Sequence, residues 1–358
     1  MNPSSVPVST KKSKYAYLNK KNDMVFCEQD VSTDLKKFDV LVKVLACGIS
    51  IANEEYKPVV DDSKMDTEYR TLGTDISGIV QSVGSEVNTL HVGDRVAGVI
   101  PVSCAQSGCG QYVVIEQYDL VRVPECINFA DAAACIGDCI RAYIALHYCS
   151  KITKDDIILV LNGALPCSNI CVQIAHHVGA KILTTCMSPT EKTYLETFDD
   201  CIDEIIDLSE STDIDDTLFN ECMNKTDNLG VDVVLDLETS MKEDKTPNQL
   251  STETIISCLT IHGRWVSCNS RLQLDPPDSQ KLFDRCACIS FLYEQAWLMS
   301  KIAQGKYQHI LTDAMHKLKE NIIKPYVYHT VNFESLPEVI QQLSKNQVNR
   351  IVASITHK

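Results

Sequence analysis

The sequence contains no apolar run that approaches the about 20 residues needed to cross a bilayer as a helix. Positive charge is also scarce, because 33 lysines and arginines stand against 48 aspartates and glutamates, which gives a formal net charge of −15. Polyanions repel such a chain, so we expect neither a nucleic-acid nor a membrane partner. Residues 1–14 lack the apolar segment of a signal peptide, and we expect them to form a disordered tail on a cytoplasmic protein.

Metal-binding cysteine patterns are missing too. None of the 17 cysteines is arranged as Cys-x-x-Cys, and no His or carboxylate cluster completes a zinc set beside them. Most of them fall inside apolar strand or helix patterns, as do Cys258, Cys286 and Cys288. We interpret the cysteines as reduced, buried, small apolar residues, and we expect no structural metal site.

Basic residues are absent from residues 199–216, which read DDCIDEIIDLSESTDIDD. We interpret this acidic block as a solvated connection between a strand and a helix. The alternative is an acidic docking face for a protein partner.

The length of 358 residues favours two domains over a single core. Residues 13–135 alternate short apolar runs with Gly or Asp turn signals at a period near two, which predicts a β-rich, partly barrel-like domain. Later in the chain, strands rich in Ile, Val and Leu alternate with helices. Continuous apolar strands separated by helices are typical of a doubly wound parallel sheet covered on both faces, so the predicted fold class is α/β.

Several stretches resemble a known family, notably GTDISGIVQSVGSEVNTLHVGDRVAGV (residues 73–99), GVDVVLDLE (residues 230–238) and HGRWVS (residues 262–267). Over nearly the whole chain the sequence resembles the quinone oxidoreductase branch of the medium-chain dehydrogenase/reductase superfamily. The resemblance implies a GroES-like catalytic domain from residues 15–138 and 293–358. It also implies a Rossmann-type nucleotide-binding domain from residues 139–292, and hydride transfer between a nicotinamide cofactor and a small-molecule substrate.

Zinc ligands are missing at the positions where the zinc-dependent members of this superfamily carry them. Those members place a cysteine after the glycine of the motif that reads ACGIS here, and a histidine after the glycine of GTD. The aligned residues are Ser50 and Thr74, neither of which is a usual zinc ligand, and Cys47 stands three residues too early. The resemblance therefore implies a zinc-independent reductase with no metal.

The loop after the strand at residues 157–161 lacks most of the glycines that a cofactor site of this kind carries. In the resembled reductases, a glycine-rich loop and the start of the next helix bind the pyrophosphate through backbone N–H groups. Here no glycine lies between Gly163 and Gly179, and Pro166 has no N–H to donate. Each lost donor weakens binding by about tenfold to hundredfold. The candidate cofactor-binding residues of this degraded loop are Asn162, Gly163, Ala164, Leu165, Pro166 and Ser168.

The next strand favours NADP over NAD. An NAD-specific site uses a carboxylate at the end of this strand to bind the ribose 2′-hydroxyl, but the strand ends in Thr184, Thr185 and Cys186. Ser188 and Lys192 follow, at positions where NADP-dependent members hold the 2′-phosphate. We expect NADPH as the cofactor, with reduced affinity. The alternative is that Lys192 is an ordinary residue on a helix surface.

Hydride transfer of this kind requires little from side chains, because the nicotinamide carries the hydride and the protein stabilises the oxyanion at the substrate carbonyl. The segment CGISIANEEY offers Ser50, Asn53 and Tyr56 as donors for that oxyanion. Arg141 stands where the resembled reductases carry a threonine beside the nicotinamide. It can bind an anionic substrate or a phosphate, or stabilise an enolate; alternatively, it fills the cofactor cleft and pairs with Asp138.

Two functions remain open at the level of the sequence. The first is a metal-free, NADPH-dependent oxidoreductase that reduces a quinone or an enone-like carbonyl. The second is a non-catalytic descendant of the same family that acts as a binding or scaffold protein. We favour the enzyme, because a scaffold has no use for Ser188 and Lys192. The resemblance also implies a homodimer, joined through the apolar strand at residues 287–293.

Overall fold

The computed structural model describes residues 10–19, 23–49, 69–104, 106–237, 250–326, 329–343 and 351–355. The chain divides into two compact units, and the division falls between Gly137 and Asp138. The first unit contains residues 1–137, 295–321 and 325–358, and the second contains residues 138–294 and 322–324. Within the described ranges, no helix has both the length and the apolar character that a membrane crossing requires.

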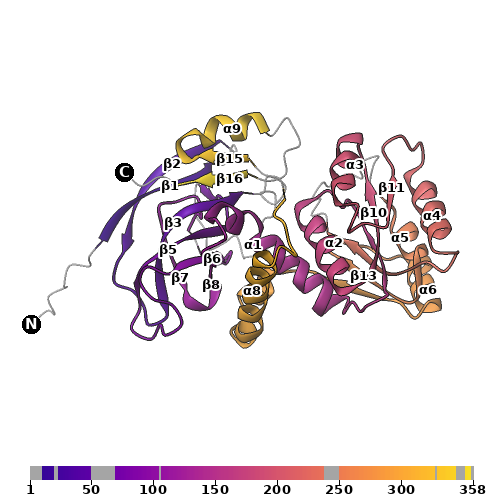
Figure 1. Ribbon diagram of the computed structural model, residues 1–358, viewed down its shortest axis with the longest axis horizontal. Helices are drawn as coiled ribbons and strands as arrows, with labels where there is room; N and C mark the ends of the chain where they lie inside the picture. Colours follow the sequence, from indigo (N-terminus) through magenta and orange to yellow (C-terminus); the bar gives the residue numbers. More distant parts are fainter. Residues whose placement is uncertain are drawn as a thin grey trace, which may run out of the picture. The chain divides into compact units, whose positions relative to one another are not determined.

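The first unit is built on β-sheets, drawn mainly in indigo in Figure 1. A three-stranded sheet has the order β2-β1-β4, with β1 at Thr10–Asn19, β2 at Met24–Ser32 and β4 at Tyr69–Thr71. A larger sheet has the order β15-β16-β3-β5-β6-β8, and β7 also pairs with β3. Its strands are β3 (Asp39–Ile49), β5 (Asp75–Val83), β6 (Arg95–Val99), β7 (Tyr112–Glu116), β8 (Leu120–Arg122), β15 (His329–Asn332) and β16 (Ile351–Ser354). The β15–β16 pair is parallel, whereas the other pairs of this sheet are antiparallel.

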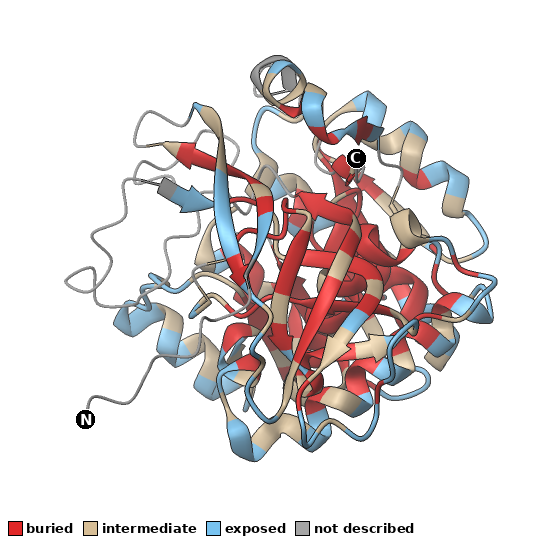
Figure 2. Ribbon diagram, turned by 90° about the vertical axis from the view of Figure 1, so that its left-hand side faces the viewer, coloured by how far each residue is buried: buried red, intermediate tan, exposed pale blue. Residues whose placement is uncertain are grey.

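Strand β3 is central to the larger sheet, because it pairs with β5, β7 and β16. Its register against β5 shifts between Leu41 and Val42 and again between Val44 and Ala46. Such bulges bend a strand and increase its twist, which curves the sheet around its core. In Figure 2 the buried residues lie mainly along these strands, while exposed residues lie on loops and outer helix faces. The predicted β-rich domain is confirmed.

Strand β1 begins at Thr10, so residues 10–14 lie in a strand and not in the tail expected from the sequence. The lysines of this segment interrupt the apolar alternation that usually indicates a strand. The strand is anchored by pairing with β2 along its length and by the buried ring of Tyr15, whose hydroxyl donates to the Tyr112 carbonyl at 2.5 Å. Residues 1–9 of the predicted tail lie outside the described residues.

Helix α8 (Gln304–Lys319) has an apolar stripe that is buried within the first unit, formed by Tyr307, Ile310, Leu311, Ala314, Met315 and Leu318. This spacing places the side chains on one face of a helix of 3.6 residues per turn. The helix packs against β8 and the neighbouring short helix at Gln117–Asp119, and Gln308 donates to the Gln117 carbonyl at 3.1 Å. The remaining α-helices of this unit are α7 (Gln295–Leu298), α9 (Leu336–Leu343) and the first part of α1 (Phe129–Tyr143).

The second unit contains a six-stranded sheet with the order β11-β10-β9-β12-β13-β14, and every neighbouring pair is parallel. The strands are β9 (Ile157–Val160), β10 (Lys181–Cys186), β11 (Glu204–Asp207), β12 (Val231–Asp236), β13 (Leu259–Ser267) and β14 (Cys288–Phe291). The helices between them are α2 (Pro166–Val178), α3 (Pro189–Leu195), α4 (Ile214–Lys225), α5 (Thr252–Ser257) and α6 (Pro276–Asp284). The predicted doubly wound parallel sheet is therefore confirmed.

All 17 cysteines are free thiols, and most are buried or half-buried, as the sequence indicated. Cys286 and Cys288 are exposed, however, which corrects the expectation that their apolar surroundings bury them. Cys288 begins β14, an edge strand whose outer side has no neighbouring strand within the described part of the chain, and Cys286 lies in the turn between α6 and β14.

Candidate functional site

The strand order of the second unit reverses between β9 and β12. From β9 the chain adds β10 and β11 on one side, and it then adds β12, β13 and β14 on the other side. In open parallel sheets, ligands bind beyond the carboxyl ends of the strands at such a reversal. The candidate loop at residues 161–165 follows β9 and therefore lies at this point, as the sequence predicted.

The loop is fixed by backbone hydrogen bonds to the neighbouring strands. Leu161 donates to the Leu235 carbonyl at 3.0 Å, and Asn162 donates to Thr185 Oγ1 at 2.8 Å. Asn162 adopts the left-handed backbone conformation with a φ of 50°. Gly163 continues the turn and donates to the Thr185 carbonyl at 3.2 Å. These N–H groups are held inside the protein and are not presented to a ligand.

Helix α2 begins with an uncapped first turn. Its N-cap is Leu165, whose side chain cannot accept a hydrogen bond, and Pro166 occupies the first helical position. Leu165 donates to the Asn162 carbonyl at 3.0 Å, whereas the N–H groups of Cys167 and Ser168 have no acceptor among the described residues. The Ser168 hydroxyl is fully buried and donates to the Leu161 carbonyl at 3.3 Å, so it faces the loop. The backbone donors of this turn without an acceptor in the described part of the chain are therefore the two N–H groups at the start of α2.

Ser188 and Lys192 lie beyond the carboxyl end of β10, on α3. Ser188 is the N-cap of that helix and accepts from the Glu191 N–H at 3.3 Å. Lys192 Nζ lies 3.1 Å from Asp207 Oδ2 at the end of β11, and both side chains remain partly exposed. Hydrogen bonds from Ser209 and from Lys192 lower the pKa of Asp207 to about 2, so this carboxylate is ionised. Both candidate 2′-phosphate residues therefore already have partners within the protein.

Arg141 is 6% exposed, and its guanidinium lies at the carboxyl ends of three strands. Nη2 donates to the carbonyl of Leu237, which follows β12, at 3.3 Å, and to Sγ of Cys268, which follows β13, at 3.4 Å. Nε lies 3.8 Å from Oε2 of Glu294, shortly after β14. The sequence suggested Asp138 as the carboxylate partner, whereas the structure provides Glu294 from a distant part of the chain.

The thiols near Arg141 respond to its charge. A hydrogen bond with Cys171 and the guanidinium of Arg141 both lower the pKa of Cys167, although burial opposes them. Burial raises the pKa of Cys268 to about 12, with Arg141 acting in the opposite direction. Burial by itself lowers the pKa of Arg141, but Cys167, Glu294 and Cys268 outweigh this effect and raise the pKa above its ordinary value, so this residue is a permanent cation.

Three of the candidate catalytic residues, Ser50, Asn53 and Tyr56, lie outside the described residues. Thr74, the other position compared with zinc ligands, donates its hydroxyl to Asp75 Oδ1 at 3.0 Å. Among the described residues, no group of three His, Cys, Asp or Glu side chains is arranged to hold a metal ion.

The acidic block at residues 199–216 uses several of its carboxylates inside the second unit. Asp203 accepts from the Ile182 N–H at 2.7 Å, and Asp213 caps α4 by accepting from the N–H groups of Asp215 and Asp216. Glu204 pairs with Lys225 at 2.8 Å. These contacts favour the interpretation of the block as a connection between a strand and a helix.

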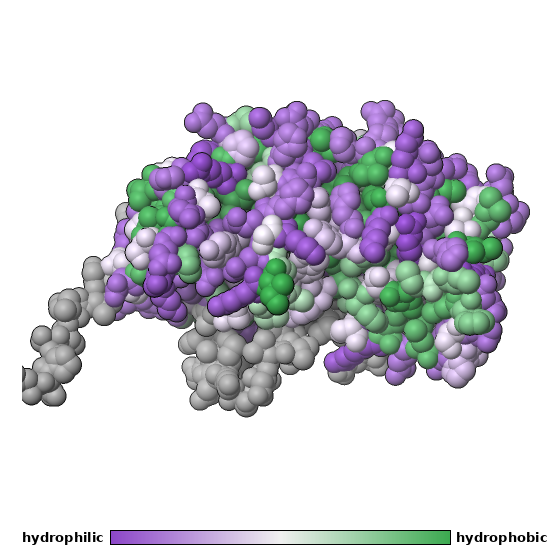
Figure 3. Space-filling view, turned by 90° about the horizontal axis from the view of Figure 1, so that it is seen from below, coloured by the Kyte–Doolittle hydropathy of each residue, from purple (hydrophilic) through white to green (hydrophobic). Residues whose placement is uncertain are grey.

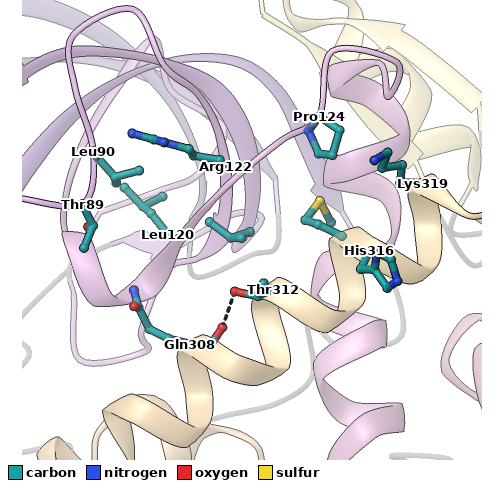
Figure 4. Close-up of a pocket in the computed structure, with 11 residues that line it drawn as sticks. Thr89, Leu90, Leu120, Arg122, Pro124, Gln308, Thr312, His316 and Lys319 are labelled. Carbon is teal, nitrogen blue, oxygen red and sulfur yellow. Dashed lines mark hydrogen bonds between the residues drawn. The ribbon is translucent and has the colours of Figure 1, made fainter.

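A groove of about 390 Å³ in the first unit could not be predicted from the sequence (Figure 4). It lies between β8 and α8 and is lined by apolar and basic side chains, among them Leu90, Leu120, Arg122, Met315, His316 and Lys319. Arg122 is already paired with Asp94 at 2.9 Å. Helical spacing on α8 indicates which residues share a face, but not that β8 leaves a gap beside them.

The chain matches the family model of the alcohol dehydrogenase GroES-like domain over residues 36–125. Among solved structures, it is similar to CurK enoyl reductase, with a TM-score of 0.76, 20% identity and coverage of 96% of this chain and 99% of that chain. It is also similar to a putative NADPH:quinone reductase from Bacillus thuringiensis, with a TM-score of 0.77, 14% identity and coverage of 96% and 99%. At such low identity these two similarities support the fold alone.

The chain belongs to the quinone oxidoreductase-like branch of the medium-chain dehydrogenase/reductase superfamily, a superfamily of oxidoreductases. Within this branch it is similar to Quinone oxidoreductase-like protein 1 of Mus musculus, with 32% identity over 334 residues, which cover 92% of this chain and 94% of the mouse protein. The family resemblance inferred from the sequence is confirmed.

Proposed function

We propose that the protein is an NADPH-dependent oxidoreductase that reduces a quinone or an enone-like carbonyl without a metal ion. The observation that carries this proposal is the uncapped start of α2 at the reversal of the parallel sheet, where the N–H groups of Cys167 and Ser168 have no acceptor among the described residues. The names of similar proteins, which include a quinone oxidoreductase and an NADPH:quinone reductase, support the choice of reaction.

The residues at the start of α2 fit a dinucleotide, although they offer fewer donors than a glycine-rich loop does. The N–H groups of Cys167 and Ser168 would hold the pyrophosphate, and the start of α2 adds the positive end of its dipole. We propose that Asn162, Gly163, Ala164, Leu165 and Pro166, which precede and begin α2, line this site. Since Pro166 cannot donate, we propose that the affinity for the cofactor is reduced.

The proposed preference for NADPH depends on Ser188 and Lys192. Lys192 is partly exposed and pairs with Asp207 at the protein surface, so a 2′-phosphate can compete for its ammonium group. The Ser188 hydroxyl, at the N-cap of α3, is the second group proposed to contact that phosphate.

When bound, the nicotinamide supplies the hydride. The contribution of the protein is to orient the substrate carbonyl and to stabilise the oxyanion that develops on it. Ser50, Asn53 and Tyr56, from the segment outside the described residues, are the proposed donors for this oxyanion. Arg141, whose guanidinium lies beyond the ends of β12 and β13 and is a permanent cation, is proposed to bind an anionic group of the bound ligand.

The test is turnover of NADPH by the full-length protein in the presence of a soluble 1,4-quinone and a metal chelator. We expect NADPH absorbance to fall at a rate proportional to the enzyme concentration, with formation of one hydroquinone per NADPH. Turnover that disappears with the chelator and returns with zinc would contradict the metal-free mechanism. A protein that shows neither turnover nor NADPH binding would instead favour the scaffold function.

We also propose a homodimer joined through β14. This edge strand leaves backbone hydrogen-bonding groups on its outer side, and a second copy of the strand can pair with them. Figure 3 shows that apolar side chains gather on part of the surface of the second unit, and its exposed apolar residues include Ile261, Phe283 and Phe291. A monomeric mass in light scattering at micromolar concentration would contradict this proposal.

A further inference from the structure

The guanidinium of Arg141 is an incompletely satisfied cation inside the second unit. It carries five N–H donors, yet its recorded hydrogen bonds are long: 3.3 Å to the Leu237 carbonyl and 3.4 Å to Cys268 Sγ. Nε is buried and has no hydrogen-bond acceptor among the described residues, because the Glu294 carboxylate at 3.8 Å is too far away to accept. Burial of a charge without a full set of hydrogen-bond acceptors destabilises the protein, and an anion bound beside the charge would supply the missing acceptors.

The start of α2 provides a second set of open donors. The N–H groups of Cys167 and Ser168 have no acceptor in the described part of the chain, and the Leu165 side chain does not cap the helix. Helix α2 extends over 13 residues, so its aligned peptide dipoles place partial positive charge at this end.

The two sets of donors lie close together in the fold. Cys167 Sγ contacts the Asp138 carbonyl at 3.8 Å, and Asp138 is one turn before Arg141 on α1. Long side chains on a helix lean toward its N-terminus, which directs the Arg141 side chain toward the turn that Cys167 contacts. Arg141 also lowers the pKa of the Cys167 thiol, in agreement with this placement.

We propose that Arg141 and the first turn of α2 form one anion site for the diphosphate group of a nucleotide. In this site the guanidinium replaces the backbone donors that the glycine-poor loop has lost. The inference rests on the proposed function for the identity of the nucleotide, but the anion site itself requires only a phosphoryl group. Free pyrophosphate carries the same chemistry and serves as the minimal probe.

Removing the charge of Glu294 should affect phosphoryl binding in the opposite direction to removing the charge of Arg141. The Glu294 carboxylate is the anion nearest to Arg141 and competes with a phosphoryl group for the guanidinium. Because its side chain is 25% exposed, it can turn toward solvent when a ligand arrives. Removing its charge should therefore strengthen binding, whereas removing the charge of Arg141 should weaken it.

The experiment measures binding of inorganic pyrophosphate and of NADPH to the full-length protein by calorimetry, in the wild type, Arg141→Gln, Glu294→Gln and Arg264→Gln. Arg264 is the matched control: it is a partly buried arginine of the same unit, pairs with Asp156 at 3.0 Å and donates to the Ser150 carbonyl at 2.8 Å. We expect Arg141→Gln to weaken both ligands by about tenfold to hundredfold. We expect Glu294→Gln to strengthen both by about threefold to fivefold, and Arg264→Gln to change neither.

The outcomes separate this inference from the proposed function. NADPH binding that is equally strong in the wild type and in Arg141→Gln overturns the anion site and leaves the proposed function standing. Pyrophosphate binding that depends on Arg141, without any NADPH binding, supports the anion site and overturns the proposed function. If Arg141→Gln does not fold, Glu294→Gln decides, because unchanged or weaker pyrophosphate binding in that variant contradicts the competition described here.

Discussion

Gly163 lies directly against Thr184: a Cβ atom at Gly163 would stand 2.0 Å from Thr184 Oγ1, which donates to the Val160 carbonyl at 2.8 Å. The loop after β9 therefore keeps this glycine because β10 leaves no room for a side chain. The glycine is required by packing whether or not a cofactor binds.

The first prediction follows from that contact. Gly163→Ala should lower the free energy of unfolding by about 1–3 kcal/mol, because the added methyl group overpacks a buried hydroxyl. Urea denaturation measures this loss. The double variant with Thr184→Ala should recover part of it, since the obstructing atoms are gone. Gly305→Ala is the control, because a Cβ there meets no atom within 4 Å, and it should not destabilise the protein. Equal losses at the two glycines would show that the contact is not the cause.

The second prediction concerns Pro166. Pro166→Gly restores an N–H group at the first position of α2 and should strengthen NADPH binding by about tenfold. The effect is read from NADPH fluorescence titrations of the wild type and the variant. Pro276→Gly is the matched control, because Pro276 begins α6 in the same unit, away from the loop after β9. An unchanged affinity in Pro166→Gly would mean that the missing donor does not limit binding.

The third prediction concerns the preference for NADPH over NADH and compares two lysines that pair with carboxylates at opposite ends of β11. Lys192 pairs with Asp207 at its carboxyl end, and Lys225 pairs with Glu204 at its amino end. Lys192→Ala should reduce the preference for NADPH over NADH by about tenfold, through the loss of one charged contact to the 2′-phosphate. Lys225→Ala should leave the preference unchanged. Competition titrations of the two cofactors give the ratio, and a similar loss in both variants would point to a general charge effect.

The fourth prediction concerns pH and the buried Asp119 in the first unit. Burial, together with the nearby Glu116, raises the pKa of Asp119 from 3.8 to about 7. Because the folded state binds this proton more tightly than the unfolded state, the stabilising contribution is complete below about pH 4 and is lost as the pH rises to about 7. Asp119→Asn should therefore be more stable than the wild type at pH 8, by roughly 2–4 kcal/mol, and the advantage should shrink toward pH 5.

Urea denaturation of both proteins at pH 5, 6, 7 and 8 checks this pH dependence. The difference in the free energy of unfolding between variant and wild type at each pH cancels the contributions of the other titrating groups, which both proteins share. A difference that does not change with pH would show that the Asp119 carboxyl is not protonated in the folded protein near neutrality.

Much of the second unit could be predicted from local patterns, because continuous apolar strands and their intervening helices are encoded within short segments. Pro166 also marks the start of α2, since proline suits the first position of a helix. The pairing of Arg141 with Glu294 could not be predicted, because the two residues meet only when β14 is in place. The sequence likewise did not indicate that the Ser168 hydroxyl faces the Leu161 carbonyl, which depends on a side-chain rotamer.

The most direct test of the central claim is an NADPH titration of the full-length protein that follows both tryptophan quenching and NADPH emission. Trp265 lies on β13 of the second unit and is buried there, so it reports energy transfer to a nucleotide bound beyond the strand ends. We predict that both signals saturate together in the micromolar range. No change in either signal up to millimolar NADPH would contradict the account.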